Sequence, residues 1–250
     1  MPIPPKEFYL PFLRQEQQAL DTISFFFSSK GRPAFGWDFV AGQYIRMFLD
    51  LPQEDPRGNY RSFSICSSPE QRDILMITTK VTATPSIFKQ KLSSLNPGEK
   101  IRFFGPLGVF VLPEQSERPL VFLAGGIGIT PLHSMLLHAK AINYKTPITL
   151  FVSCSTVEEA AFYDELTNIS QEHQSIKVIY TITHPEESQT PWIGETGRIS
   201  PELIKKYVPQ EANAQYFICG PQKMVDAMVE MVQEMNVPPE QIKKENFTGY

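Results

Sequence analysis

Three glycines follow a run of apolar residues near the middle of the chain: Gly125, Gly126 and Gly128. The order of residue types predicts a buried strand, a tight turn and a helix, and glycine suits a turn where backbone and ligand approach closely. Thr130 can cap the helix and Pro131 fits its first position, which leaves free N–H groups facing the turn. Such a helix end attracts phosphate. The match to the dinucleotide fingerprint G-x-G-x-x-G is partial, because Pro131 stands where the last glycine belongs.

A second motif, Arg61-Ser62-Phe63-Ser64, ends another predicted strand. A guanidinium binds phosphate through paired charge-assisted hydrogen bonds, so Arg61 is a candidate anion-binding residue. The alternative is an edge-strand arginine beside an inward-facing phenylalanine.

Further short motifs complete a pattern that resembles a known family. Besides the arginine motif, these are Gly105-Pro-Leu-Gly-Val-Phe110, Cys219-Gly-Pro-Gln-Lys-Met224 and Glu245-Asn-Phe-Thr-Gly-Tyr250. Their order and spacing resemble the ferredoxin-NADP reductase superfamily from about Phe35 to Tyr250. These are FAD-dependent reductases that exchange electrons between a nicotinamide nucleotide and a one-electron carrier.

The resemblance implies a flavin site in the first part of the chain. Arg61 would bind the FAD pyrophosphate, Phe63 would lie along the flavin and Ser64 would hydrogen-bond near flavin N5. Ser62 belongs to the same cofactor-binding motif.

A second part of the flavin site is implied where relatives carry a basic-Val pair and then a glycine turn. Here Lys80 and Val81 occupy the pair, and Ser86 with neighbouring N–H groups could hold the pyrophosphate. The sequence departs from the pattern at Ala83, which stands at the usual glycine. An ordinary helix start at Ser86 is therefore the alternative.

The resemblance also implies a nicotinamide site built from Cys219, Gly220 and Pro221. Hydride transfer requires no covalent nucleophile, so we expect Ser64, Cys219 and Glu245 to line the transfer site without forming bonds to substrate.

The end of the chain is expected to cover the flavin. Phe247 aligns better with the shielding ring of the family than Tyr250 does, and a frayed tail is the alternative for both.

Selectivity between the two nicotinamide nucleotides depends on residues after the second parallel strand. NADPH-specific relatives often place arginine there, but this chain has Cys154 and Ser155 followed by Glu158 and Glu159. Carboxylates repel a 2′-phosphate, which favours NADH over NADPH. Thr156 with Glu159 is also a capping box, so these acids could simply start a helix.

Composition narrows the class of protein. The chain has 250 residues, 42% of them hydrophobic, and 23 basic against 27 acidic residues give a net charge of -4. That balance argues against nucleic-acid binding, and no apolar run is long enough for membrane insertion. We expect a cytoplasmic protein.

Cysteine and histidine usage predicts neither a disulfide framework nor a metal centre. Three distant cysteines are too few for a standard iron–sulfur cluster, so electrons would pass to a separate acceptor. The four histidines lack metal-ligand spacing.

Hydrophobic patterning predicts two domains. Residues 1–114 contain alternating β-branched and aromatic stretches, which indicates an all-β antiparallel barrel that would bind FAD. Residues 115–250 alternate apolar strands at 120–124, 147–152, 176–182 and 215–219 with helices at 131–143, 157–168 and 221–235. This alternation predicts a parallel-sheet α/β domain that would bind NAD(P).

The sequence therefore predicts an FAD-containing NAD(P)H reductase whose partner is a one-electron carrier such as a ferredoxin, or an oxygenase component. The alternative is a non-catalytic regulatory or assembly subunit that retains the fold.

Overall fold

A computed structural model describes residues 4–30 and 38–247. The chain divides into two units, the first comprising Met1–Leu112 with His133–His138 and the second Pro113–Leu132 with Ala139–Tyr250. The proline-bracketed stretch 112–119 spans this division.

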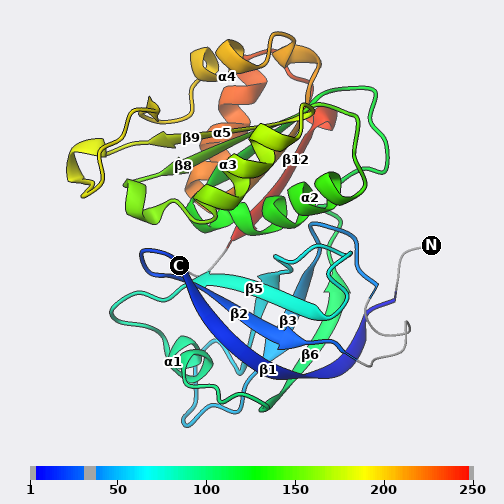
Figure 1. Cartoon of the computed structure of the whole chain (residues 1–250), viewed down its shortest axis with the longest axis vertical. Coiled ribbons are helices and arrows are strands. Elements are labelled where there is room, and N and C mark those ends of the chain that lie inside the picture. The colour runs from blue at the N-terminus through cyan, green and yellow to red at the C-terminus, as the bar shows by residue number, and fades with distance from the viewer. Residues whose placement is uncertain (1–3, 31–37, 248–250) are drawn as a thin grey trace. The chain divides into compact units, whose positions relative to one another are not determined.

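The first unit is an antiparallel sheet with strand order β4-β3-β6-β1-β2-β5 (Figure 1). Its strands are β1 Lys6–Ala19, β2 Thr22–Ser28, β3 Tyr44–Phe48, β4 Tyr60–Ser64, β5 Ile74–Lys80 and β6 Lys100–Leu107. The edge strands β4 and β5 contact one another, and just beyond β4 the N–H of Cys66 donates to the carbonyl of Met76 at 2.8 Å. The sheet therefore closes on itself, which confirms the predicted antiparallel barrel.

Aromatic side chains fill the interior of this barrel. Phe27 packs edge-on against Phe103, with ring centroids 5.0 Å apart, and both are fully buried. Helix α1, Ile87–Ser93, adds Phe88 and Leu92 to the same core. Burying each such side chain contributes about 1.5–3 kcal/mol, so the core fixes α1 and β4, and β4 carries the motif Arg61–Ser64.

The second unit is a parallel sheet with strand order β10-β9-β8-β7-β11-β12. Its strands are β7 Leu120–Gly125, β8 Ile148–Cys154, β9 Ile176–Ile182, β10 Glu195–Thr196, β11 Gln215–Pro221 and β12 Ile242–Phe247. Every residue of β7 is buried, as expected for a central parallel strand covered on both faces. The predicted α/β domain is confirmed.

Helices cover this sheet, with α3 in front of it and α5 behind it in Figure 1. The α-helices are α2 Ile129–Ala141, α3 Tyr163–Glu172, α4 Pro201–Tyr207 and α5 Gln222–Glu234. Short 3-10 turns are η1 Gly126–Gly128, η2 Val157–Glu159, η3 Pro185–Glu187, η4 Glu211–Asn213 and η5 Pro239–Gln241. Within the described ranges, no helix is both long enough and apolar enough to cross a bilayer.

One predicted helix is split. The stretch 157–168 forms η2, and α3 begins only at Tyr163 and runs to Glu172. Phe162 between them adopts a left-handed conformation with φ of 60°, which interrupts the helical hydrogen bonding.

Candidate functional site

The glycine turn after β7 packs against the end of β11. A Cβ built on Gly128 would lie 2.2 Å from the carbonyl oxygen of Cys219, and one built on Gly125 would lie 1.7 Å from Met224 Sδ. Gly126 has φ of +50°, which glycine adopts without strain. The glycines therefore let two turns of one sheet edge approach each other, in addition to any approach of a ligand.

Thr130 is not the N-cap that the sequence suggested. Helix α2 begins at Ile129 and continues directly from η1, and the Thr130 hydroxyl donates back to the carbonyl of Ile127 at 3.1 Å. Pro131 accordingly follows the first helical positions. Because the 3-10 turn supplies the first turn of the helix, the N–H groups that could face a phosphate shift toward the glycines.

The structure brings the cysteine motif and the end of the chain together. Strands β11 and β12 are parallel neighbours, and β11 also pairs with β7, where Cys219 faces Ala124. The register between β11 and β12 pairs Cys219 with Glu245, Gly220 with Asn246 and Pro221 with Phe247. Tyr250 lies outside the described residues, so the choice between Phe247 and Tyr250 remains a prediction.

Burial shapes the chemistry of this strand end. It raises the pKa of Glu245 to about 7 and, with the nearby Glu245 charge, raises the pKa of the Cys219 thiol well above its usual value. A thiol that stays protonated is a poor nucleophile, as expected for a residue that only lines a site.

Two buried acceptor atoms at this strand end, Glu245 Oε2 and Asn246 Oδ1, have no hydrogen-bond partner in the described part of the chain. Buried acceptors of this kind are costly unless a donor reaches them. An amide group such as the nicotinamide carboxamide supplies N–H donors, so this strand end fits that group.

Arg61 is held in one orientation by its own loop. Its Nη2 donates to Asp55 Oδ2 at 2.5 Å, and its Nη1 donates to the carbonyls of Gly58 and Tyr60 at 2.8 and 2.7 Å. The guanidinium lies over the Phe88 ring, 4.9 Å from its centroid. Among residues 4–30 and 38–247, Arg61 Nε has no acceptor, and the Nε side of a guanidinium binds phosphate well.

A cavity of about 590 Å³ lies beside the Arg61–Asp55 ion pair. Its lining residues belong to the β3–β4 loop: Leu49, Asp50, Leu51, Gln53, Glu54, Asp55, Gly58 and Asn59.

The other residues of the arginine motif differ in their surroundings. Ser62 is exposed and Ser64 is buried, whereas Phe63 is 9% exposed and packs against Phe88, 6.1 Å between ring centroids. Phe63 is thus part of the barrel core, and its position along a flavin remains a prediction.

Ser86 is the N-cap of α1, since its Oγ accepts from the N–H of Lys89 at 3.4 Å. The ordinary helix start, which was the alternative at this position, is therefore present, and Phe88 of the same helix contacts Arg61. Val81 has a structural role, because its N–H donates to the carbonyl of Asp21 at 2.6 Å. Lys80 ends β5.

Three charged residues near Arg61 escaped the sequence analysis: Asp55, Arg57 and Lys89. The turn sequence Asp55-Pro56-Arg57-Gly58 was a usable signal, because Asp and Pro favour such turns. Nothing in sequence spacing links Lys89 to the loop.

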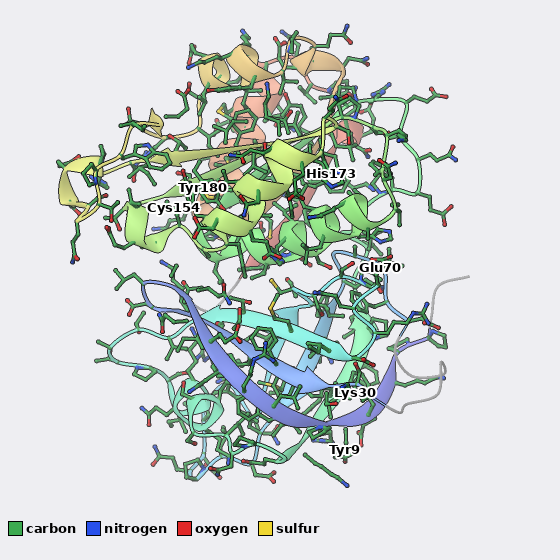
Figure 2. All side chains as sticks on the ribbon, in the orientation of Figure 1. Tyr9, Lys30, Glu70, Cys154, His173 and Tyr180 are labelled. Carbon is green, nitrogen blue, oxygen red and sulfur yellow. The ribbon has the colours of Figure 1, made fainter. Side chains whose placement is uncertain are left out.

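The residues after β8 are hydrogen-bonded to the loop that follows β9. Cys154, labelled in Figure 2, is buried at the end of β8. The alternative that these acids start a helix is met in part, because Thr156 is the N-cap residue of the short turn η2 and Glu158 and Glu159 lie in its first turn, but the Thr156 side chain makes no capping hydrogen bond. Instead Glu158 Oε1 accepts from the N–H of Thr190 at 2.9 Å, which ties η2 to the loop after β9.

The histidines have packing and surface contacts. His133 is buried with Nδ1 2.8 Å from the Cys66 carbonyl, and His138 Nδ1 lies 2.8 Å from Glu70 Oε1. His184 lies with Glu186 and Glu187 on an exposed turn, close enough together for a shared cation. Because these three side chains are exposed to water, they would bind a cation only weakly.

Comparison with known proteins agrees with this geometry. The family model described as oxidoreductase NAD-binding domain matches residues 122–230. A flavohemoprotein of Pseudomonas putida is 29% identical over 244 residues, which cover 97% of this chain and 59% of that protein. One component of the Na(+)-translocating NADH-quinone reductase of Marinomonas sp. is 25% identical, covering 85% of this chain and 61% of that polypeptide. The chain thus spans about three fifths of the length of these curated relatives.

Solved structures share the fold. The cytochrome P450 reductase GcoB of Amycolatopsis superimposes with a TM-score of 0.81 at 23% identity, covering 98% of this chain and 71% of that one. A ferredoxin NADP+ reductase of Neisseria gonorrhoeae, solved with bound FAD and NADP, has a TM-score of 0.75 at 24% identity and covers 96% of this chain and 98% of that one.

Proposed function

We propose that this chain is an FAD-containing reductase that oxidises NAD(P)H and passes electrons to a separate acceptor, because it matches the oxidoreductase NAD-binding domain over residues 122–230 and is similar to a flavohemoprotein and a ferredoxin NADP+ reductase. The observation that carries the proposal is that three neighbouring parallel strands end together. Strand β7 ends in the glycine turn, β11 in Cys219–Pro221 and β12 in Glu245–Phe247. Ligands of open α/β sheets bind outside such carboxyl ends.

The first unit supplies residues that fit FAD. Arg61 offers a fixed guanidinium edge, and Ser86 with its neighbouring backbone offers N–H groups for the pyrophosphate. Lys80, Val81 and the motif Ser62–Ser64 would complete the binding residues. FAD, when bound, supplies the capacity to accept a hydride and release electrons singly.

Residues of the second unit would orient the nucleotide. The glycine turn and the start of α2 would hold its phosphates, while Gly220 and Pro221 shape the turn that the nicotinamide passes. Cys219 stays a neutral thiol, and Glu245 holds or releases a proton near neutral pH because its pKa is raised to about 7. Orientation and exclusion of water would lower the barrier.

Finer assignments are part of the same proposal. The barrel part, residues 1–114, would be the FAD domain and residues 115–250 the NAD(P) domain. The acceptor would be a one-electron carrier such as a ferredoxin, or an oxygenase component, in the cytoplasm. Solved neighbours include a cytochrome P450 reductase and a ferredoxin reductase of carbazole 1,9a-dioxygenase, which supports an oxygenase system.

The test is to purify the chain and identify its flavin after denaturation, then to add NADH without oxygen. We expect released FAD, and loss of the yellow flavin absorption that ferricyanide restores. Released FMN alone would contradict the FAD assignment. A protein that binds nucleotide but is never reduced would support the alternative regulatory or assembly role.

A further inference from the structure

The outer side of strands β4, β3, β6 and β1 carries an ordered set of arginine and aromatic side chains. Successive side chains of a strand point to opposite faces, and the inward set here, with Ile45, Met47 and Phe103, is buried in the barrel core. The pairing register aligns the outward set in two rows across the four strands, and these eight residues are the outer sheet face. From β4 to β1, one row is Tyr60, Phe48, Arg102 and Tyr9, and the other is Ser62, Arg46, Phe104 and Glu7.

Cation–π contacts place both arginines over aromatic rings of this face. The Arg102 guanidinium lies 4.1 Å from the centroid of the Phe48 ring, and the Arg46 guanidinium lies 5.4 Å from that of Tyr60. Phe48 and Tyr60 also pack together, with ring centroids 5.4 Å apart. Both rings stay accessible, since Tyr60 is 41% exposed and Phe48 is only partly buried. Arginine and aromatic residues are the types enriched where proteins bind one another.

The charges on this face have both signs. Arg102 pairs with Glu7 at 3.4 Å, and the Tyr9 hydroxyl donates to Glu7 at 3.2 Å. The hydrogen bond to Glu7 and, to a smaller extent, the charge of exposed Asp50 raise the pKa of Tyr9, so Asp50 adds a second carboxylate nearby. Arg46 Nε is buried and has no acceptor in the described part of the chain, which is unfavourable. A partner surface of one sign would be repelled by part of this face, whereas a surface with the same mixture would not.

The layout of the rows is complementary to a copy of itself. When two copies pack face to face, a two-fold axis that runs between β3 and β6 and parallel to them exchanges β3 with β6 and β4 with β1. Phe48 of one copy then meets Arg102 of the other, and Arg46 meets Phe104. Each arginine therefore lies against an aromatic ring of the opposite copy.

We propose that this chain forms a two-fold symmetric dimer through the outer sheet face, in which Arg46 of each copy pairs with Glu7 of the other. In the two-fold arrangement Glu7 of the second copy lies opposite Ser62, and Ser62 is the cross-strand neighbour of Arg46. The Glu7 carboxylate is half exposed, so it can accept a further hydrogen bond. It supplies the acceptor that Arg46 Nε lacks, and the symmetry forms this contact twice.

This dimer leaves the flavin motif of the first unit uncovered. Along β4, Tyr60 and Ser62 alternate with Arg61 and Phe63, so the two pairs face opposite sides of the strand. Phe63 packs in the barrel core, and the Arg61 guanidinium lies over the Phe88 ring of α1. Dimerisation thus goes beyond the proposed reductase activity and does not depend on it.

The oligomeric state of the full chain tests the proposal. Sedimentation velocity at about 1 to 100 μM is measured for wild type, Arg46→Glu, Glu7→Arg and an equimolar mixture of the two variants. The matched control is Arg72→Glu, because Arg72 is an exposed arginine of the first unit in the turn before β5, away from the outer sheet face.

We expect wild type and Arg72→Glu to dimerise alike. Arg46→Glu and Glu7→Arg should each raise the dimer dissociation constant about a hundred-fold or more, because two like-charge contacts replace two ion pairs. The equimolar mixture should dimerise again, since a mixed dimer holds one native contact and one contact with both charges reversed.

Three results would overturn the proposal. A wild-type chain that is still monomeric at about 100 μM would reject the dimer and leave this face open to a different protein. A dimer that persists in both single variants would place the interface elsewhere. Single variants that are monomeric and do not combine in the mixture would show damage to the barrel rather than loss of the contact between Arg46 and Glu7.

Discussion

Glu245 illustrates how position alone can change a residue's chemistry. It is an ordinary glutamate in sequence, yet strand β12 places it beside Cys219, and burial there raises its pKa from 4.5 to about 7. At neutral pH the carboxyl group is therefore close to half protonated. A carboxyl group with this pKa can gain or lose its proton when the charge of a nearby nicotinamide changes. Groups with pKa values shifted in this way are often found at functional sites.

The raised pKa predicts a pH-dependent stability. Between pH 4.5 and 7 the unfolded chain has lost this proton while the folded chain keeps it, so stability falls as pH rises through that window. The full loss is about 3 kcal/mol, reached above pH 7. The Gln side chain of Glu245→Gln cannot ionise, so this variant should not lose stability as pH rises. In denaturant titrations at about pH 5 and about pH 8, its free energy of unfolding relative to wild type should therefore be higher at the higher pH.

The exposed Glu240→Gln, in the turn before β12, is the control for that experiment. It should follow wild type at both pH values. A constant difference between Glu245→Gln and wild type would show that Glu245 is ionised throughout.

Residue-level predictability was uneven. Arg61 could be identified from sequence because a guanidinium binds phosphate and because Arg61–Ser64 resembles a motif of the ferredoxin-NADP reductase superfamily. Its partner Asp55 and its neighbour Lys89 did not, because their proximity depends on a loop and a helix that meet only after folding. Thr130 was misassigned because sequence signals for a cap cannot distinguish a helix start from a preceding 3-10 turn.

At the scale of elements, apolar runs were the dependable signal. Strands β7, β8, β9 and β11 lie in the middle of their sheet and were predicted within two residues at most of their ends. The long strand β1 was not predicted, because the residues from Arg14 to Gln17 are polar and exposed. Strand β12 was expected only as a C-terminal tail, because its two lysines interrupt the apolar pattern that would indicate a strand paired with β11.

The glycine turns lead to a prediction about element packing. Gly128→Ala places a methyl group against the backbone carbonyl of Cys219, which cannot move without shifting β11, so we expect a loss of about 1–3 kcal/mol or more. Gly125→Ala meets the flexible thioether of Met224 instead and should cost less. Urea unfolding of both variants gives the comparison.

A double variant sharpens this test. Met224→Ala should relieve Gly125→Ala but leave Gly128→Ala unchanged, because a Cβ on Gly125 meets the Met224 side chain whereas one on Gly128 meets the backbone of Cys219. Equal destabilisation of the two glycine variants, with no rescue, would contradict the packing assigned to the turns.

At the scale of the whole molecule, we expect charge to decide which nucleotide is preferred. The chain carries a net charge of -4, and backbone hydrogen bonds hold the pKa of Glu158 below its usual value. NADPH brings additional negative charge, so kcat/KM with ferricyanide should favour NADH by about ten-fold, and added salt should narrow the gap. Glu159→Gln should also reduce the preference for NADH, and it leaves the Glu158–Thr190 hydrogen bond in place. The control is Glu230→Gln at an exposed position of α5, which should leave the preference unchanged. An equal or reversed preference would show that another cation, such as Arg198 or Lys223, captures the 2′-phosphate.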